Sequence, residues 1–170
     1  SLINDQLIRD EARKLKLEVP AEQVDAQLAR IRQQNGWTEV QLDAAVQQLA
    51  GADPRAQLIG FFDVMDLWFN DPDFRGCVFL NTAAEFADRC DPIHQAAAMH
   101  KKANRDIFRD LAARAGATDP EAFADHYTIM LEGTLILRHV HGRNDAARIA
   151  RPAVLTLIES SIPAPSSASP

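Results

Sequence analysis

The residues that could carry out chemistry in this chain are few and widely spaced. The histidines are His94, His100, His126, His139 and His141, and the cysteines are Cys77 and Cys90. No two histidines stand four residues apart, the spacing that puts two zinc ligands on one face of a helix. The sequence also contains no glycine-rich phosphate loop, no nucleophile elbow and no Cys-x-x-Cys pair. We therefore predict no catalytic residue, no metal site and no cofactor, and an enzyme built on Cys77, His100 and Glu85 is the weakest functional hypothesis.

One stretch, residues 74–86, places polar groups at helical spacing among apolar ones. Asn81 and Glu85 are four residues apart and so share a helix face, which also carries Cys77. The basic residues of the next helix that could meet them are His100, Lys101 and Arg105. Two interpretations stay open: a buried polar network that ties two helices together, or a set of polar groups that orients a ligand in an apolar pocket.

Cys77 itself also allows two interpretations. A thiol near a helix N-terminus can serve as a sensor, whereas a small buried cysteine is a common component of hydrophobic cores. Two cysteines are too few for a disulfide framework, so we expect both to be reduced thiols, as in the cytoplasm.

The composition narrows the class of protein further. Hydrophobic residues make up 46% of the 170 residues, which is enough for a core and excludes the disordered class. All aromatic residues except Trp37 follow residue 60, so the main core and any apolar pocket belong to the second part. The net charge of −6 and the absence of an uninterrupted basic run argue against a chain that binds nucleic acid by itself. No apolar stretch approaches the ~20 residues of a membrane span, and no signal peptide is recognisable, so we expect no membrane partner.

Asp-Pro pairs divide the second part of the chain into helices. They stand at 53–54, 71–72, 91–92 and 119–120, and Asp can cap a helix whose first position is Pro. Three helices are predicted before residue 51, and the later ones are predicted at 53–70, 75–89, 92–115, 120–141 and 145–160. Gly133 indicates a close approach by another backbone or a ligand, and Pro152 either kinks the last helix or begins it. The predicted fold is therefore all-α, with a Pro/Ser-rich disordered tail at 162–170.

The second part of the chain, from residue 53 to about 160, resembles the C-terminal domain of TetR/AcrR-type transcriptional regulators. The motifs that carry the resemblance are Phe-Arg-Gly-Cys at 74–77, Phe-Leu-Asn at 79–81, Ala-Ala-Glu-Phe at 83–86, His-Lys at 100–101, Leu-Glu-Gly at 131–133 and Asp-Ala-Ala-Arg at 145–148. The resemblance implies a helical bundle over residues 52–161 that binds a small apolar effector in an internal pocket. Pro152 departs from the family pattern, in which the last helix is uninterrupted.

The same resemblance assigns residues to two sites. The effector would contact Phe62, Met65, Cys77, Asn81, Glu85, His100, Tyr127 and Met130. The last two helices of each subunit would pair in a homodimer, through an interface that includes Gly133, Leu137, Val154, Leu155 and Ile158. Such a protein is a cytoplasmic repressor, in which effector binding changes the spacing of two DNA-reading heads.

Residues 1–51 do not carry the helix-turn-helix signature of that family, so we expect DNA contact only if a head is supplied elsewhere. They resemble instead the N-terminal helical region of SurA-type periplasmic chaperones. The motifs concerned are Leu-Ile-Asn-Asp-Gln-Leu-Ile at 2–8, Glu-Val-Pro at 18–20 and Arg-Gln-Gln-Asn-Gly-Trp at 32–37. This second resemblance implies an alternative function, a periplasmic chaperone-like module that binds unfolded peptides. A natural fusion, an engineered chimera and a mis-joined sequence would all produce such a join near residue 51.

Overall fold

The computed structural model describes residue 51 and residues 53–163, and this part of the chain holds five α-helices and no strand. The helices are α4 (Pro54–Phe69), α5 (Val78–Glu85), α6 (Pro92–Arg114), α7 (Pro120–His141) and α8 (Ala146–Ser161). The all-α class predicted from the sequence is therefore confirmed. None of the described helices combines the length and apolarity needed to cross a membrane. The three helices predicted before residue 51 lie outside the described residues.

Aspartate side chains begin three of these helices. The carboxylate of Asp53 accepts hydrogen bonds from the amides of Arg55 and Ala56, both at 3.2 Å. Asp91 and Asp119 cap α6 and α7 in the same way, and a proline follows each cap. Proline fits the first turn because that turn has no acceptor for its missing amide hydrogen. As a result α4, α6 and α7 begin within one residue of the predicted starts, and α4, α6, α7 and α8 all match the predicted bounds to within one residue.

The prediction of a helix at 75–89 was wrong at both ends, because α5 spans only Val78–Glu85. The Asp71-Pro72 pair forms a turn instead of a helix start, with the Phe74 amide donating to the Asp71 carbonyl at 3.0 Å. Gly76 then adopts a φ of +85°, a left-handed conformation that suits glycine, and Cys77 is extended. These two backbone conformations delay the helix until residue 78.

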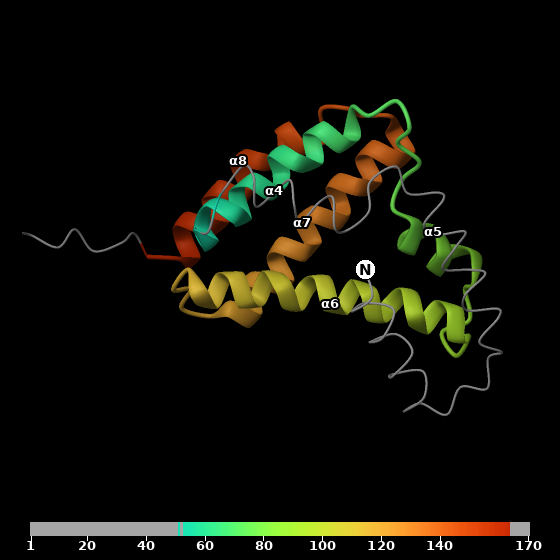
Figure 1. Cartoon of the computed structure of the whole chain (residues 1–170), viewed down its shortest axis with the longest axis horizontal. Coiled ribbons are helices and arrows are strands. Elements are labelled where there is room, and N and C mark those ends of the chain that lie inside the picture. The colour runs from blue at the N-terminus through green and yellow to red at the C-terminus, as the bar shows by residue number, and fades with distance from the viewer. Residues whose placement is uncertain (1–50, 52, 164–170) are drawn as a thin grey trace, which may run out of the picture.

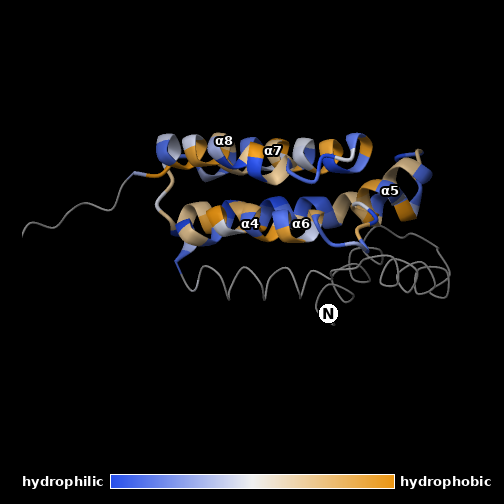
Figure 2. Cartoon of the chain, turned by 90° about the horizontal axis from the view of Figure 1, so that it is seen from above, coloured by the Kyte–Doolittle hydropathy of each residue, from blue (hydrophilic) through white to orange (hydrophobic). Residues whose placement is uncertain are grey.

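The five helices form two layers. Figure 2 shows α7 and α8 in one layer and α4 and α6 in the other, with α5 at one end of the molecule. Within this arrangement α4 lies along α8, α6 packs against α7, and α5 rests on α6 (Figure 1). The short α5 buries only Val78 and Thr82, so it has the smallest packed surface of the five.

The core between the layers is aromatic, as expected for the second part of the chain. Tyr127 is fully buried and its ring meets Phe62 at 5.5 Å and Phe108 at 4.5 Å between centroids. Its hydroxyl donates a 2.7 Å hydrogen bond to the carbonyl of Leu58 on α4. Burial raises the pKa of Tyr127 well above its ordinary value, so the phenol stays neutral and remains a donor.

The last helix, α8, passes through Pro152 without beginning there, so the proline lies inside the helix on an exposed position. The helix is tied to α4 by ion pairs between Arg151 and Asp63 at 2.7 Å and between Arg148 and Asp66 at 3.4 Å. Ile162, which the sequence placed in the disordered tail, is buried in the core. Ordered packing therefore continues one residue beyond α8.

Candidate functional site

The outer face of α7 carries an exposed apolar stripe. Ile129, Gly133, Ile136 and Val140 recur at intervals of four, three and four residues, which places them on one side of the helix. Ile129 and Val140 are 69% and 64% exposed, although residues of this type are usually buried. A Cβ atom added to Gly133 would meet nothing within 4 Å. The fold of a single chain thus provides no reason for a glycine at this position.

The neighbouring helix α8 presents a matching stripe. Ile149, Ala153, Thr156 and Ser160 follow the same four-three-four spacing and are all exposed. Apart from the isoleucine these are small side chains, which allow another surface to approach the helix backbone. The two stripes lie on adjacent helices, because α7 packs against α8.

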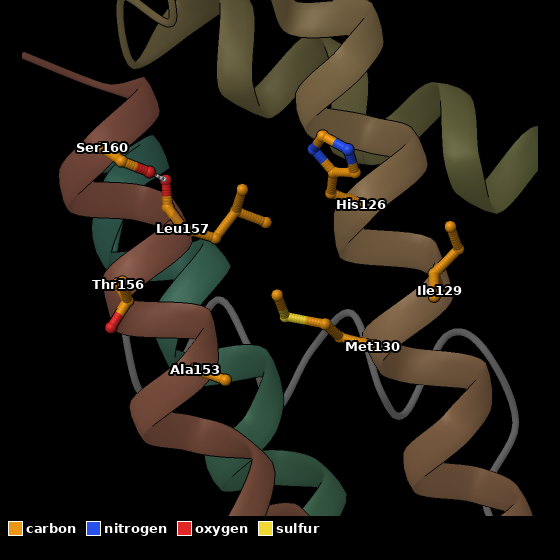
Figure 3. Close-up of a pocket in the computed structure, with 7 residues that line it drawn as sticks. All are labelled: His126, Ile129, Met130, Ala153, Thr156, Leu157 and Ser160. Carbon is orange, nitrogen blue, oxygen red and sulfur yellow. Dashed lines mark hydrogen bonds between the residues drawn. The ribbon is translucent and has the colours of Figure 1, made fainter.

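A groove of about 540 Å³ runs between these two helices. Its lining is mostly apolar and consists of His126, Ile129, Met130, Ala153, Thr156, Leu157 and Ser160. Figure 3 shows the side chains of Met130 and Leu157 pointing toward one another across the groove, with His126 at its wall. An apolar groove of this size on an outer face is typical of a site that another molecule covers.

The residues predicted for a dimer interface separate into two groups in the structure. Gly133 and Leu137 lie on the exposed side of α7. Val154 and Ile158 are 1% and 0% exposed, because they face α4 and α7 and belong to the core of their own subunit. Leu155 is half-buried. Counting along α8 from the buried positions identifies Ile149, Ala153 and Thr156 as the residues on its outer side.

A second polar cluster joins α6 and α7 to the start of α5. The Lys101 ammonium donates to both carboxylate oxygens of Glu132, at 2.8 and 3.1 Å. Cys77, at the start of α5, contributes to the electrostatic surroundings of this lysine. Burial lowers the pKa of Lys101, but Cys77 and Glu132 more than offset that effect, and the net pKa is raised. The lysine is therefore a stable cation between three elements.

His100 stands beside that lysine and is buried at the α5–α6 contact. Its ring stacks on Phe79, with 3.3 Å between centroids and 9° between ring planes. Burial, aided by the charge of Lys101, lowers the pKa of His100 to about 3. The imidazole is consequently neutral at physiological pH.

The structure corrects the expected polar network around Asn81 and Glu85. Both side chains are exposed on α5, since the face of this helix that packs against α6 carries Val78 and Thr82. Asn81 donates only a long 3.4 Å hydrogen bond, to the carbonyl of Arg75. The network that does tie α6 to α7 uses Lys101 with Glu132, a residue absent from the predicted site.

The Phe-Arg-Gly-Cys motif forms the turn that carries Cys77 into this cluster. Phe74 packs on Trp68 and Phe69, and the guanidinium of Arg138 lies 4.3 Å above its ring. Arg138 also donates a 2.8 Å hydrogen bond to the carbonyl of Phe69. The His139 ring contacts Gly76 so closely that a Cβ atom there would collide with it. The motif thus joins the end of α4 to the end of α7.

The predicted effector-binding residues are not gathered in one cavity. Phe62, Met65 and Tyr127 are fully packed in the core, whereas Met130 lines the outer groove. Cys77 and His100 belong to the α5–α6 junction described above. Sequence spacing could not separate these three environments, because it shows which face a residue occupies and not what covers that face.

The described residues thus form a five-helix domain around an aromatic core, with an apolar outer face on the last two helices. The chain matches the family described as tetracyclin repressor-like, C-terminal domain, over residues 54–154. This match covers more than half of the chain, so the chain belongs to the TetR family of transcriptional regulators through its C-terminal, ligand-sensing domain. The resemblance expected from the motifs is confirmed, and the chain is a regulator domain and not an enzyme.

Two solved structures share the fold. SCO4454, a TetR-family transcriptional regulator from Streptomyces coelicolor, has a TM-score of 0.67 and 23% identity, over 79% of this chain and 70% of that chain. The regulator sav143 from Streptomyces avermitilis has a TM-score of 0.61 and 23% identity, over 81% of this chain and 69% of that chain. A comparison with curated proteins finds no match. None of these comparisons supports the chaperone resemblance or the chimera interpretation of residues 1–51, of which the structure describes only residue 51.

Proposed function

We propose that this chain senses a small apolar effector as a homodimer, and that two copies associate through the outer faces of α7 and α8. The observation that carries the proposal is the exposed stripe around Gly133. This glycine lies inside the continuous helix α7, and a side chain at its position would meet no neighbouring atom of the same chain within 4 Å. Glycine costs about 1 kcal/mol relative to alanine inside a helix. A close approach by the backbone of a second copy would explain why the cost is tolerated.

The surface has the composition that self-association requires. The stripes of α7 and α8 and the groove between them are apolar or small, and the charged residues that flank them belong to other faces of the two helices. A stable dimer buries about 1,600 Å² in total, which two helices from each subunit can supply. The predicted interface residues Gly133 and Leu137 remain part of this proposal, whereas Val154 and Ile158 would support it from within the core.

Molar mass by light scattering over a dilution series tests the association. We expect twice the chain mass of 18.8 kDa for the unmodified protein. Gly133→Leu should shift the mass toward that of one chain, because the leucine fits the subunit but not a closely approaching partner. Ala113→Leu, which adds three side-chain carbons instead of four at an exposed position of α6, is the matched control and should leave the dimer intact. A dimer that is insensitive to Gly133→Leu would refute the proposed face.

The proposed effector site lies between α5 and the aromatic core. Phe62, Met65 and Tyr127 leave little space in the described state, so an effector would have to displace a neighbouring element. The helix with the smallest packed surface is α5, which packs against α6 and whose half-buried Phe79 stacks on His100. An effector that enters there would contact apolar side chains and the neutral ring of His100.

Binding of N-phenyl-1-naphthylamine, a neutral apolar dye that fluoresces when it leaves water, tests the site. We expect saturable binding, and Phe79→Ala should change its affinity because that ring forms one wall. Binding that does not saturate, or that Phe79→Ala leaves unchanged, would contradict an effector site at α5.

The proposal extends to partner and compartment. The acidic net charge of −6 disfavours DNA binding by this domain alone, so DNA would be contacted only through a head supplied elsewhere. A repressor that reads DNA acts in the cytoplasm, where we place this chain. Tight, salt-dependent binding of duplex DNA by the chain itself would overturn that part of the proposal.

A further inference from the structure

One side of α4 is buried although it is not part of the aromatic core. Gln57, Gly60 and Val64 stand three and four residues apart, so they share this side of the helix. Gln57 is 4% exposed, Val64 is 0% exposed, and Gly60 is also buried. Val64 nevertheless does not belong to the hydrophobic core that the described residues form. That core therefore does not account for the burial of these three residues, which we call the outer side of α4.

The chain that precedes α4 is tied to this outer side by a hydrogen bond. The side-chain amide of Gln57 donates from Nε2 to the carbonyl of Gly51 at 2.6 Å. Gly51 has a φ of +61°, a left-handed conformation that suits glycine and lets the chain reverse its direction. The chain before residue 51 thus reaches α4 at the end of the outer side where Gln57 lies.

The sequence directly before Gly51 carries a stripe that matches this side in spacing and length. Leu42, Ala45 and Leu49 recur at three and four residues and are all apolar. From the first to the last they span seven residue steps, as do the residues of the outer side. At a rise of ~1.5 Å per residue, a helical stripe of this kind is about 10 Å long. Two such stripes can therefore cover one another over their whole length.

We propose that the outer side of α4 is a docking surface for residues 38–49 of the same chain, which pack along it in the antiparallel direction. The pairing places Leu49 beside Gln57 and Leu42 beside Val64. Between them Gly60, which has no side chain, allows the segment to approach the backbone of α4 closely. The surface belongs to α4, in the layer opposite α7 and α8 (Figure 2), so the inference does not depend on the proposed dimer.

Photo-crosslinking of the full chain identifies what covers this surface. The photoreactive residue p-benzoyl-L-phenylalanine takes the place of Leu67, which is three residues beyond Val64 and 55% exposed. After irradiation we expect mass spectrometry to find links to residues 38–49, in a yield that does not fall when the protein is diluted. The same probe in place of Ile129, on the outer face of α7, is the control and should not link to that segment.

Three results of the crosslinking would overturn the proposal. Links from position 67 only to residues 53–163 would show that the described helices themselves surround it. Links that disappear on dilution would assign the surface to a second copy of the chain. The absence of any link would show that nothing is docked beside this end of α4.

Thiol labelling tests the register of the pairing. Val64→Cys, in a full chain whose native cysteines are replaced by serine, should react slowly with N-ethylmaleimide because the position is covered. Leu42→Asp should speed this reaction by about tenfold or more, because a carboxylate loses its hydration in an apolar contact and the segment detaches. Gln47→Asp introduces the same charge in the same segment but outside its apolar stripe, and should leave the rate unchanged.

Circular dichroism establishes that each labelled variant is folded. If Leu42→Asp does not fold, Leu42→Ala should still raise the labelling rate at position 64, by a smaller factor. A rate that rises equally with Leu42→Asp and Gln47→Asp, or with neither of them, would refute the pairing of Leu42 with Val64.

Discussion

Lowering the pH from 7 to 5 should destabilise this domain through one buried residue, His100. The ring is stacked on Phe79 and 8% exposed, and burial together with the charge of Lys101 lowers its pKa to about 3. In the unfolded chain the same group titrates at about 6.5. Between these two values the unfolded state binds a proton that the folded state does not bind.

The size of the effect follows from that difference. Stability rises with pH wherever the unfolded state holds more protons, so the free energy of unfolding falls as the pH decreases below 6.5. Well below pH 6.5, each further decrease of one pH unit lowers the free energy of unfolding by about 1.4 kcal/mol. Most of the window between pH 7 and 5 lies below the unfolded pKa, so the expected loss is about 2 kcal/mol.

Urea denaturation of the unmodified chain and of His100→Gln at pH 7, 6 and 5, at one protein concentration, measures this loss. The free energy of unfolding of the unmodified chain should fall by about 2 kcal/mol more than that of the variant over this range. The difference between the two curves cancels the titration of all other groups. The carboxylates with lowered pKa, such as Asp106 and Asp125, lose their contribution only at more acidic pH. Parallel pH curves for the two proteins would show that His100 is accessible to protons, and the packing described at α5 would be refuted.

Three further substitutions test the packing. Tyr127→Phe should lower the free energy of unfolding by about 1 kcal/mol, measured by urea denaturation, because the buried carbonyl of Leu58 loses a 2.7 Å hydrogen bond. Gly76→Ala should cost about 1–2 kcal/mol from its φ of +85° alone. The same change made together with His139→Ala should recover only the part of the cost that comes from the ring contact, and full recovery would contradict the backbone argument. Gly133→Ala should raise the free energy of unfolding of the subunit by up to about 1 kcal/mol, measured by thermal denaturation, because alanine favours a helix more than glycine does. Light scattering should show that the same variant associates more weakly. A variant that associates more tightly would contradict the proposed interface.

Local signals explain what could be predicted from the sequence. Asp-Pro pairs act on the residues next to them, so the starts of α4, α6 and α7 followed directly. The same signal failed at Asp71-Pro72, because Phe74 must turn back onto the end of α4 and Gly76 takes a left-handed conformation. A competing tertiary contact thus decided where α5 begins.

Pairings between distant residues could not be predicted in the same way. Lys101 and Glu132 are 31 residues apart, and no spacing rule connects them. Asn81 and Glu85 do share one face of a helix, but sequence alone does not show that α5 turns this face outward. On α8 the apolar residues occupy both sides, so Val154 and Ile158 could be separated from Ile149 only once the position of α4 was known.

The hydrogen bond between α4 and the end of α8 has a consequence for how this domain can be joined to other sequences. The Arg55 guanidinium donates to the carbonyl of Ile162 at 3.0 Å, so residues that are 107 positions apart in the chain lie at the same end of the bundle. A short linker from residue 163 to residue 53 should therefore close the chain into a ring without distorting it. New termini could then be opened in the exposed loop around Gly116, between α6 and α7. A permuted domain of this kind would begin with α7 and run from α8 through the linker into α4, while preserving the faces of α7 and α8.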